Sequence, residues 1–159
     1  MTSETRTRAL TQLSDDEQMF REAVRDFADA EVRPLVHEMD QRAEFDRGLL
    51  PKFIELGLMG IDIPEQYGGL GFGSAAYSRT LQEIAKHDAS VALTVGAHSS
   101  IGMRGLLLFG TEAQKERWLP RLATGQMIAA FCLTEPGAGS DAAAVRTTAA
   151  RQGDHWVLN

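Results

Sequence analysis

The sequence predicts a mainly α-helical chain that changes to β-structure towards its C-terminal end. Apolar residues recur with helical spacing from about residue 14 to residue 122, and capping signatures precede two of these segments. Short strand-like runs separated by glycine follow Gly125. We therefore expect a helical domain over residues 1–126 and the incomplete start of a β-domain over residues 127–159, since two or three strands rarely form a stable unit.

The first helix is expected over residues 14–33. Ser14 and Glu17 form an S-x-x-E capping box, in which each side chain satisfies an orphan amide. The helix then carries one apolar stripe, at Phe20, Val24 and Phe27. Pro34 should stop or kink it, because proline disfavours helical geometry in the residue before it.

Four further helices are expected, over residues 46–56, 74–86, 90–109 and 112–122. Asp46 and Gly57 should cap the first of them, and Thr111 with Gln114 supplies a second capping box for the last. A glycine-rich loop separates the first two. The segment 90–109 is apolar, but it contains His98, three glycines and a charge, which favours a buried helix over a membrane span.

The C-terminal part reads as three short strands, over residues 127–133, 145–148 and 155–158. Gln152-Gly153-Asp154 is a hairpin signal between the last two. Cys132 lies in the first of these strands, where a small buried hydrophobic residue is the ordinary interpretation.

Composition excludes several classes of function. The net charge of −6 leaves no basic stripe for nucleic acid. A single cysteine excludes a disulfide framework and a multi-cysteine zinc site, and we expect no metal. Residues 1–11 have neither the apolar core of a signal peptide nor an amphipathic basic face, so we expect a cytoplasmic protein.

The run Thr134–Asp141 is the densest candidate for chemistry, because two glycines and a hydroxyl follow a predicted strand and can approach a phosphate. Gly137-x-Gly139-x-x-Ala142 also matches a dinucleotide-binding fingerprint. The β-branched residues after it and the helices before it argue against that alternative. Glu135 is either a base or a brace of the tight turn.

Three motifs resemble the acyl-CoA dehydrogenase flavoprotein family. Along the chain they are IPEQYGGLG at 63–71, FGTEAQKERWLP at 109–120 and CLTEPGAGSDAAA at 132–144. This is the order in which the family carries them. The resemblance implies an N-terminal helical domain, a β-barrel-like middle domain and a C-terminal helical bundle, with FAD between them. This chain would hold the first domain and the first strands of the second, so that the fold is truncated.

The resemblance also implies the roles of individual residues. The run Phe131, Cys132, Leu133 and Thr134 would lie along the flavin, with Thr134 hydrogen-bonding near its N5 edge. Gly139 and Ser140 would approach the phosphates of FAD, and Ser140 would also touch the acyl-CoA substrate. The catalytic base of the family is a glutamate in the C-terminal part, so no catalytic residue is expected in this chain, and Glu135 is not that base.

The implied reaction is α,β-dehydrogenation of a fatty acyl-CoA in β-oxidation, with electron-transfer flavoprotein as acceptor and a homo-oligomer as the full-length form. Residues 96–102 and 106–146 look closest to very-long-chain acyl-CoA dehydrogenases, and small residues there would leave a deep acyl pocket. Two alternatives remain open. One is a non-catalytic helical module that binds acyl-CoA or a partner, and the other is a related acyl-CoA oxidase or flavin monooxygenase.

Overall fold

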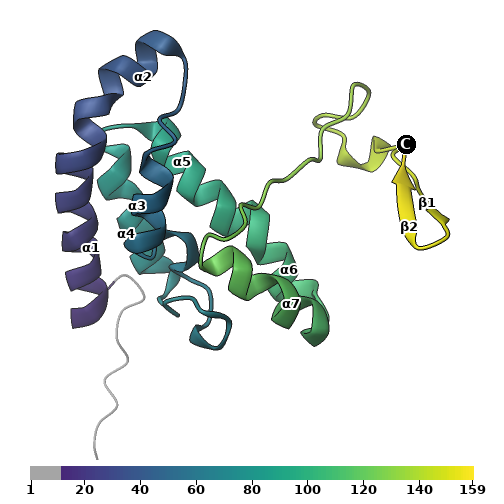
Figure 1. The fold of residues 1–159 in the computed structure, drawn as a ribbon, viewed down its shortest axis with the longest axis horizontal. Coiled ribbons are helices and arrows are strands. Elements are labelled where there is room, and N and C mark those ends of the chain that lie inside the picture. The colour runs from purple at the N-terminus through teal and green to yellow at the C-terminus, as the bar shows by residue number, and fades with distance from the viewer. Residues whose placement is uncertain (1–11) are drawn as a thin grey trace, which may run out of the picture.

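The computed structural model describes residues 12–159, so the segment on which the targeting expectations rest lies outside the described residues. Helices occupy most of the described chain and a hairpin ends it (Figure 1). The main elements are α1 (Asp15–Phe27), α2 (Val36–Arg42), α3 (Leu49–Glu55), α4 (Ser74–Ala85), α5 (Ala89–Ala97), α6 (Arg104–Phe109), α7 (Glu112–Ala123), β1 (Ala149–Gln152) and β2 (His155–Leu158).

The first helical run begins as the sequence predicts. The Glu17 amide donates to Ser14 Oγ at 3.1 Å, and the Ser14 amide donates to Glu17 Oε2 at 2.7 Å, which confirms the capping box. The run does not stop at Pro34. It passes through a π-helical turn, η1 (Ala28–Val32), and a 3-10 turn, η2 (Arg33–Leu35), and continues as α2. These changes of hydrogen-bonding register accommodate a residue that has no backbone N–H.

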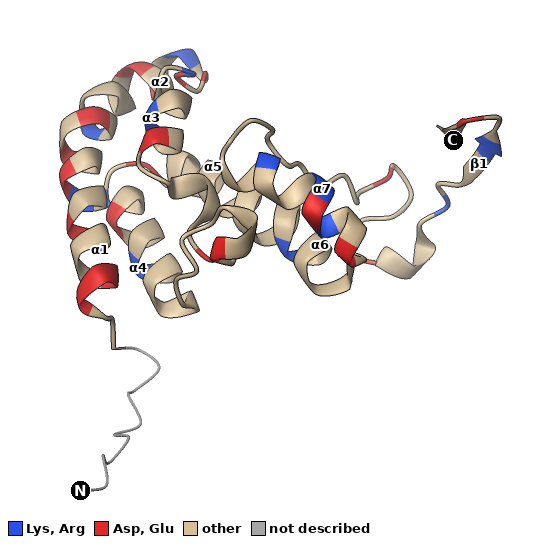
Figure 2. Ribbon diagram, turned by 60° about the horizontal axis from the view of Figure 1, so that its bottom comes forward, with Lys and Arg blue, Asp and Glu red and all other residues tan. Residues whose placement is uncertain are grey.

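The larger core forms where α1, α4 and α5 pack side by side (Figure 1). Val24 is fully buried in it, and Phe20 and Phe27 pack against it, as the apolar stripe predicts. The rings of Phe27 and Phe53 meet edge to face with centroids 6.0 Å apart, which brings α3 onto the same core. The opposite face of α1 is rich in acidic residues (Figure 2).

The second helix is shorter than expected. Asp46 does not cap it; its Oδ1 instead accepts the Gly48 amide at 2.7 Å in a turn, and α3 begins at Leu49. Gly57 ends the helix with a φ of +78°, a left-handed conformation that favours glycine. The prediction was therefore right for the end of this helix and wrong for its start.

The apolar run Ala89–Phe109 is helical throughout, although a π-helical segment, η5 (His98–Met103), separates α5 from α6. Its 21 residues are long and apolar enough to cross a membrane by length and composition alone. The core helix of a water-soluble protein passes the same test. Here Val91 and Val95 are buried in the larger core, and Met103 is buried in a second one.

The last helix, α7, has the predicted capping box: the Thr111 amide donates to Gln114 Oε1 at 2.9 Å and the Gln114 amide to Thr111 Oγ1 at 3.3 Å. Leu119 and Leu122 are buried in the second core, against η5 and the loop before α4, and Trp118 packs on its edge. Gly125 turns the chain out of the helix with a φ of +71°.

The C-terminal hairpin is confirmed, with an offset. Strands β1 and β2 are antiparallel, and Gln152 pairs with His155 across Gly153 and Asp154. The first strand covers residues 149–152 rather than 145–148, and residues 127–133 are not a strand. A strand needs a neighbour for its N–H and C=O groups, and none of the described segments lies beside residues 127–133 as a partner strand.

Candidate functional site

The segment that leaves α7 is held to the helices only at its beginning. The Met127 amide donates to the Arg121 carbonyl at 3.0 Å. The Ala129 amide donates to Nδ1 of His98, on η5, also at 3.0 Å. Beyond Ala130 the chain runs out from the helices towards the hairpin (Figure 1).

The residues expected to face the cofactor lie in this extended stretch. Phe131 is 56% exposed and Leu133 is 45% exposed, and Cys132 and Thr134 are exposed as well. The expectation that Cys132 is buried in a strand is therefore wrong for this chain. The apolar side chains and the backbone of this stretch have no covering element among the described residues.

A tight turn follows, and Glu135 holds it together. Glu135 and Ala138 exchange two backbone hydrogen bonds of 3.1 Å around Pro136 and Gly137. The Glu135 carboxylate accepts the amides of Arg146 and Thr147, at 2.9 and 2.8 Å, and the Thr147 hydroxyl. These hydrogen bonds, the Thr147 hydroxyl first, lower the pKa of Glu135. Glu135 is thus a brace.

Gly139 and Ser140 come directly after this turn, and both are exposed. A Cβ added at Gly139 would meet nothing within 4 Å, so the backbone can be approached closely. The next element is a single 3-10 turn over Ala142–Ala144, which Asp141 caps by accepting the Ala143 amide at 3.1 Å. The dinucleotide-binding alternative needs an α-helix at this point, so the structure argues against it.

A second feature is an apolar groove of about 500 Å³ between α4 and the run α5–η5. Small residues form much of its wall, including Ala85, Ala89, Ala92, Gly96 and Ala97. The helices approach closely here, since a Cβ on Gly96 would stand 3.2 Å from Leu81 Cδ1. The small side chains of its wall leave the groove room for an extended apolar chain.

Two hydroxyls border the groove near η5. Tyr77 donates to the Gly96 carbonyl at 2.9 Å, and Ser100 donates to the same oxygen at 2.7 Å. Burial raises the pKa of Tyr77, so this phenol stays protonated at neutral pH. Both hydroxyls thus have a partner, and the groove keeps an apolar interior.

Comparison with known proteins identifies the family. Residues 14–126 match the family described as "Acyl-CoA dehydrogenase, N-terminal domain". The chain belongs to the acyl-CoA dehydrogenase family. It is 42% identical over 159 residues to the human "Very long-chain specific acyl-CoA dehydrogenase, mitochondrial", covering 99% of this chain and 23% of the human protein.

Solved structures agree with this assignment. A structure of acyl-CoA dehydrogenase complexed with FAD from Bacillus anthracis superposes with a TM-score of 0.84 at 41% identity, over 93% of this chain and 26% of that one. A chain in a structure of the electron transferring flavoprotein of Acidaminococcus fermentans gives a TM-score of 0.87 at 39% identity, over 93% of this chain and 39% of that one. The chain thus spans well under half the length of each of these relatives.

Sequence reasoning missed one residue that the structure places at the start of the exposed segment. His98 is buried, and Nε2 lies 3.0 Å from the Leu122 carbonyl while Nδ1 accepts the Ala129 amide. The only signal in the sequence is a histidine within an apolar helix. That signal does not say which distant backbone groups the ring will meet.

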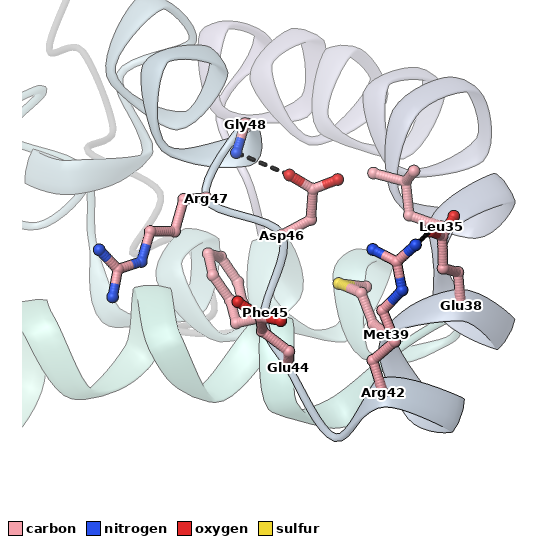
Figure 3. Close-up of a pocket in the computed structure, with 9 residues that line it drawn as sticks. All are labelled: Leu35, Glu38, Met39, Arg42, Glu44, Phe45, Asp46, Arg47 and Gly48. Carbon is pink, nitrogen blue, oxygen red and sulfur yellow. Dashed lines mark hydrogen bonds and ion pairs between the residues drawn. The ribbon is translucent and has the colours of Figure 1, made fainter.

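A separate pocket of about 280 Å³ lies between α2 and the start of α3 (Figure 3). Arg42 pairs there with Glu38, four residues earlier on α2, at 2.5 Å, and Arg47 points away from that pair (Figure 3). His37, Glu38 and Asp40 also lie on α2. The pocket is remote from residues 131–140 (Figure 1).

Proposed function

We propose that this chain forms the N-terminal part of an FAD-dependent acyl-CoA dehydrogenase that removes hydrogen from the α and β carbons of long-chain fatty acyl-CoA. One observation carries the proposal. The run 131–134 leaves the helical domain of this family extended and exposed, with its apolar side chains uncovered. A segment of this kind is suited to lie against a flat apolar group.

The residues present fit a flavin nucleotide. Phe131 and Leu133 offer apolar side chains to a planar ring. Thr134 has an exposed hydroxyl, able to donate to the edge of such a ring. Gly137 and Gly139 have open space where a Cβ would stand, so their backbone amides can come close to phosphate oxygens.

Each residue then has a defined task. Thr134 would donate a hydrogen bond to the flavin, and Phe131, Cys132 and Leu133 would help to exclude water from it. Gly139 and Ser140 hold phosphate oxygens, and Ser140 also contacts the acyl-CoA. FAD, when bound, supplies the acceptor for the hydride that leaves the β carbon.

Glu135 does not remove the α-proton in this proposal. Its carboxylate is engaged by three donors from residues 146 and 147, which leaves it a positioning task in the turn. The base is a glutamate supplied from outside residues 1–159.

The groove between α4 and α5 forms one wall of the acyl site. Its small side chains leave depth for a long tail, in keeping with the likeness to very-long-chain enzymes. Electron-transfer flavoprotein is the proposed acceptor, and the complete enzyme is proposed to be a homo-oligomer.

A chimaera tests the proposal. This chain would replace the matching N-terminal segment of the Bacillus anthracis relative, whose structure contains FAD. We expect a yellow protein whose flavin band bleaches with palmitoyl-CoA. Thr134→Val should slow this bleaching about 10-fold or more, because it removes a donor worth about 1.5–3 kcal/mol to developing charge. A folded chimaera that binds FAD but is reduced by no acyl-CoA would contradict the proposal.

A further inference from the structure

Both ring nitrogens of His98 bind backbone groups from segments far along the chain. The ring is buried, with Nε2 3.0 Å from the Leu122 carbonyl and Nδ1 3.0 Å from the Ala129 amide nitrogen. A carbonyl can only accept and an amide N–H can only donate, so the ring is neutral with its proton on Nε2. Only a group with a donor and an acceptor in this geometry satisfies both partners.

The same place has a second close contact. A Cβ built on Gly102 of η5 would stand 2.5 Å from the Ala129 Cβ, so the chain passes directly over this glycine. Ala129 is thus held by a hydrogen bond to His98 and by packing against Gly102, four residues further along the same helical run. The next backbone hydrogen bond further along the chain is at Glu135, beyond the run that the proposed function places against the flavin.

We propose that His98 is a positioning residue that sets the point and direction from which residues 131–134 leave the helical domain. The inference rests on the proposed function for what that segment faces. Four residues separate Ala129 from Thr134, and their backbone makes no hydrogen bond to the helices. A displacement of Ala129 is therefore carried to the residues that the proposed function places against the cofactor. Misplacement of such residues by about 1 Å can lower the reaction rate about 100-fold.

A purely space-filling role for His98 makes a different prediction. If the ring only filled the core, any substitute of similar size would act alike. If its two hydrogen bonds position the segment, a substitute that keeps the bond to Ala129 should hold Ala129 better than one that keeps only the bond to Leu122. Asparagine keeps an acceptor near the place of Nδ1 for the Ala129 amide. Glutamine instead keeps a donor near the place of Nε2 for the Leu122 carbonyl.

Amide hydrogen exchange of the 159-residue chain, without flavin, tests this difference. We expect His98→Gln to speed exchange at Ala129 by about tenfold or more relative to His98→Asn, because only the asparagine keeps the acceptor. The amides of Val24 and Ile84, in the other core, should exchange alike in the two variants. Equal exchange at Ala129 in the two variants, or an unprotected Ala129 amide in the unmodified chain, would overturn the proposal.

A matched pair of glycine variants provides a second measurement. Gly102→Ala should also speed exchange at Ala129, since the new methyl displaces the segment. Gly105→Ala, three residues further along, meets nothing within 4 Å and should leave Ala129 unchanged. If Gly102→Ala and Gly105→Ala changed exchange at Ala129 equally, the proposed attachment of Ala129 to η5 would be contradicted.

The consequence for the reaction is measured in the chimaera. His98→Gln should lower the rate of flavin reduction with little change in acyl-CoA affinity, and His98→Asn should restore much of the rate. If the exchange test fails, only the positioning role proposed for His98 is contradicted, because that test contains no flavin. Failure of acyl-CoA to reduce the unmodified chimaera speaks against the proposed function.

Discussion

Ala43 adopts a conformation that usually belongs to glycine. It ends α2 with a φ of +49°, and it is the one non-glycine residue with positive φ in the described part of the chain. The Glu44 amide donates to the Met39 carbonyl at 3.1 Å, closing the helix end around Ala43. The left-handed conformation costs a residue with a Cβ about 1 kcal/mol.

We therefore expect Ala43→Gly to raise the free energy of unfolding by about 0.5–1 kcal/mol. Ala23→Gly, at an exposed position inside α1, is the matched control and should lower it by about 1 kcal/mol. Urea denaturation followed by circular dichroism measures both. Destabilisation by both variants would show that the left-handed cap at Ala43 is not strained.

Glu83 is a buried carboxylate between α1 and α4. It is 2% exposed, with Arg21 Nη2 at 2.7 Å from Oε1 and Lys86 bound to Oε2. Burial alone would raise the pKa of Glu83, but the hydrogen bonds from Lys86 and Arg21 outweigh burial and lower it. Because the folded-state pKa is lowered, Glu83 stabilises the fold above the unfolded-state pKa of about 4.3, and this contribution is lost as pH falls.

Glu83→Gln should lower the free energy of unfolding by about 1–3 kcal/mol at pH 7, since two cations lose their buried partner. The difference from the unmodified chain should shrink as pH falls below about 4.3. Asp26→Asn, which breaks an exposed pair with Arg25 on the same helix, should change stability by less than about 0.5 kcal/mol. If the free energies of unfolding of Glu83→Gln and the unmodified chain differed as much at pH 3 as at pH 7, the stabilising role of the Glu83 charge would be contradicted.

At the scale of elements, the features that the sequence predicted depend on neighbouring residues. The two capping boxes, at Ser14 and Thr111, and the left-handed glycine at 57 involve groups at most a few residues apart. Residues 127–133 were predicted wrongly because an apolar run becomes a strand only beside a partner strand. The first hairpin strand is displaced because the amides at 146 and 147 are engaged by Glu135.

In the candidate site, too, local features are predictable from the sequence and contacts between distant residues are not. The run 131–140 is proposed as the site from the order of its residues, since a signature is local. The docking of Ala129 on His98 could not be found in this way, because the two residues lie 31 positions apart and meet through a backbone amide. The two π-helical turns, η1 and η5, were also missed, because an altered hydrogen-bond register leaves no periodic signal.

The groove between α4 and α5 makes a prediction about chain length. Ala97→Leu would fill part of it, so in the chimaera the affinity for palmitoyl-CoA should fall more than that for octanoyl-CoA. Each methylene of the tail displaced from the groove costs about 0.8 kcal/mol. Ala113→Leu, exposed on α7 outside the groove, should leave both affinities unchanged. An equal loss for the two substrates would place the acyl tail elsewhere.

At the scale of the whole molecule, large apolar side chains are exposed both on the helices and after α7. The residues after α7 that are more than half exposed are Ile128, Phe131, Trp156 and Leu158. On the helical run Ala89–Phe109, Leu93, Ile101, Leu108 and Phe109 are also more than half exposed, although the helices form two buried cores. The hairpin also has unpaired strand edges. We expect the 159-residue chain by itself to keep its helical dichroism and to associate in sedimentation experiments.

The central claim is that residues 131–140 form one part of a flavin site that other segments complete. Titration of FAD into the 159-residue chain and into the chimaera, followed by flavin fluorescence, tests it most directly. The account predicts weak or no binding by the chain alone and one tightly bound FAD in the chimaera. Tight, stoichiometric binding of FAD by the 159-residue chain as a monomer would contradict it.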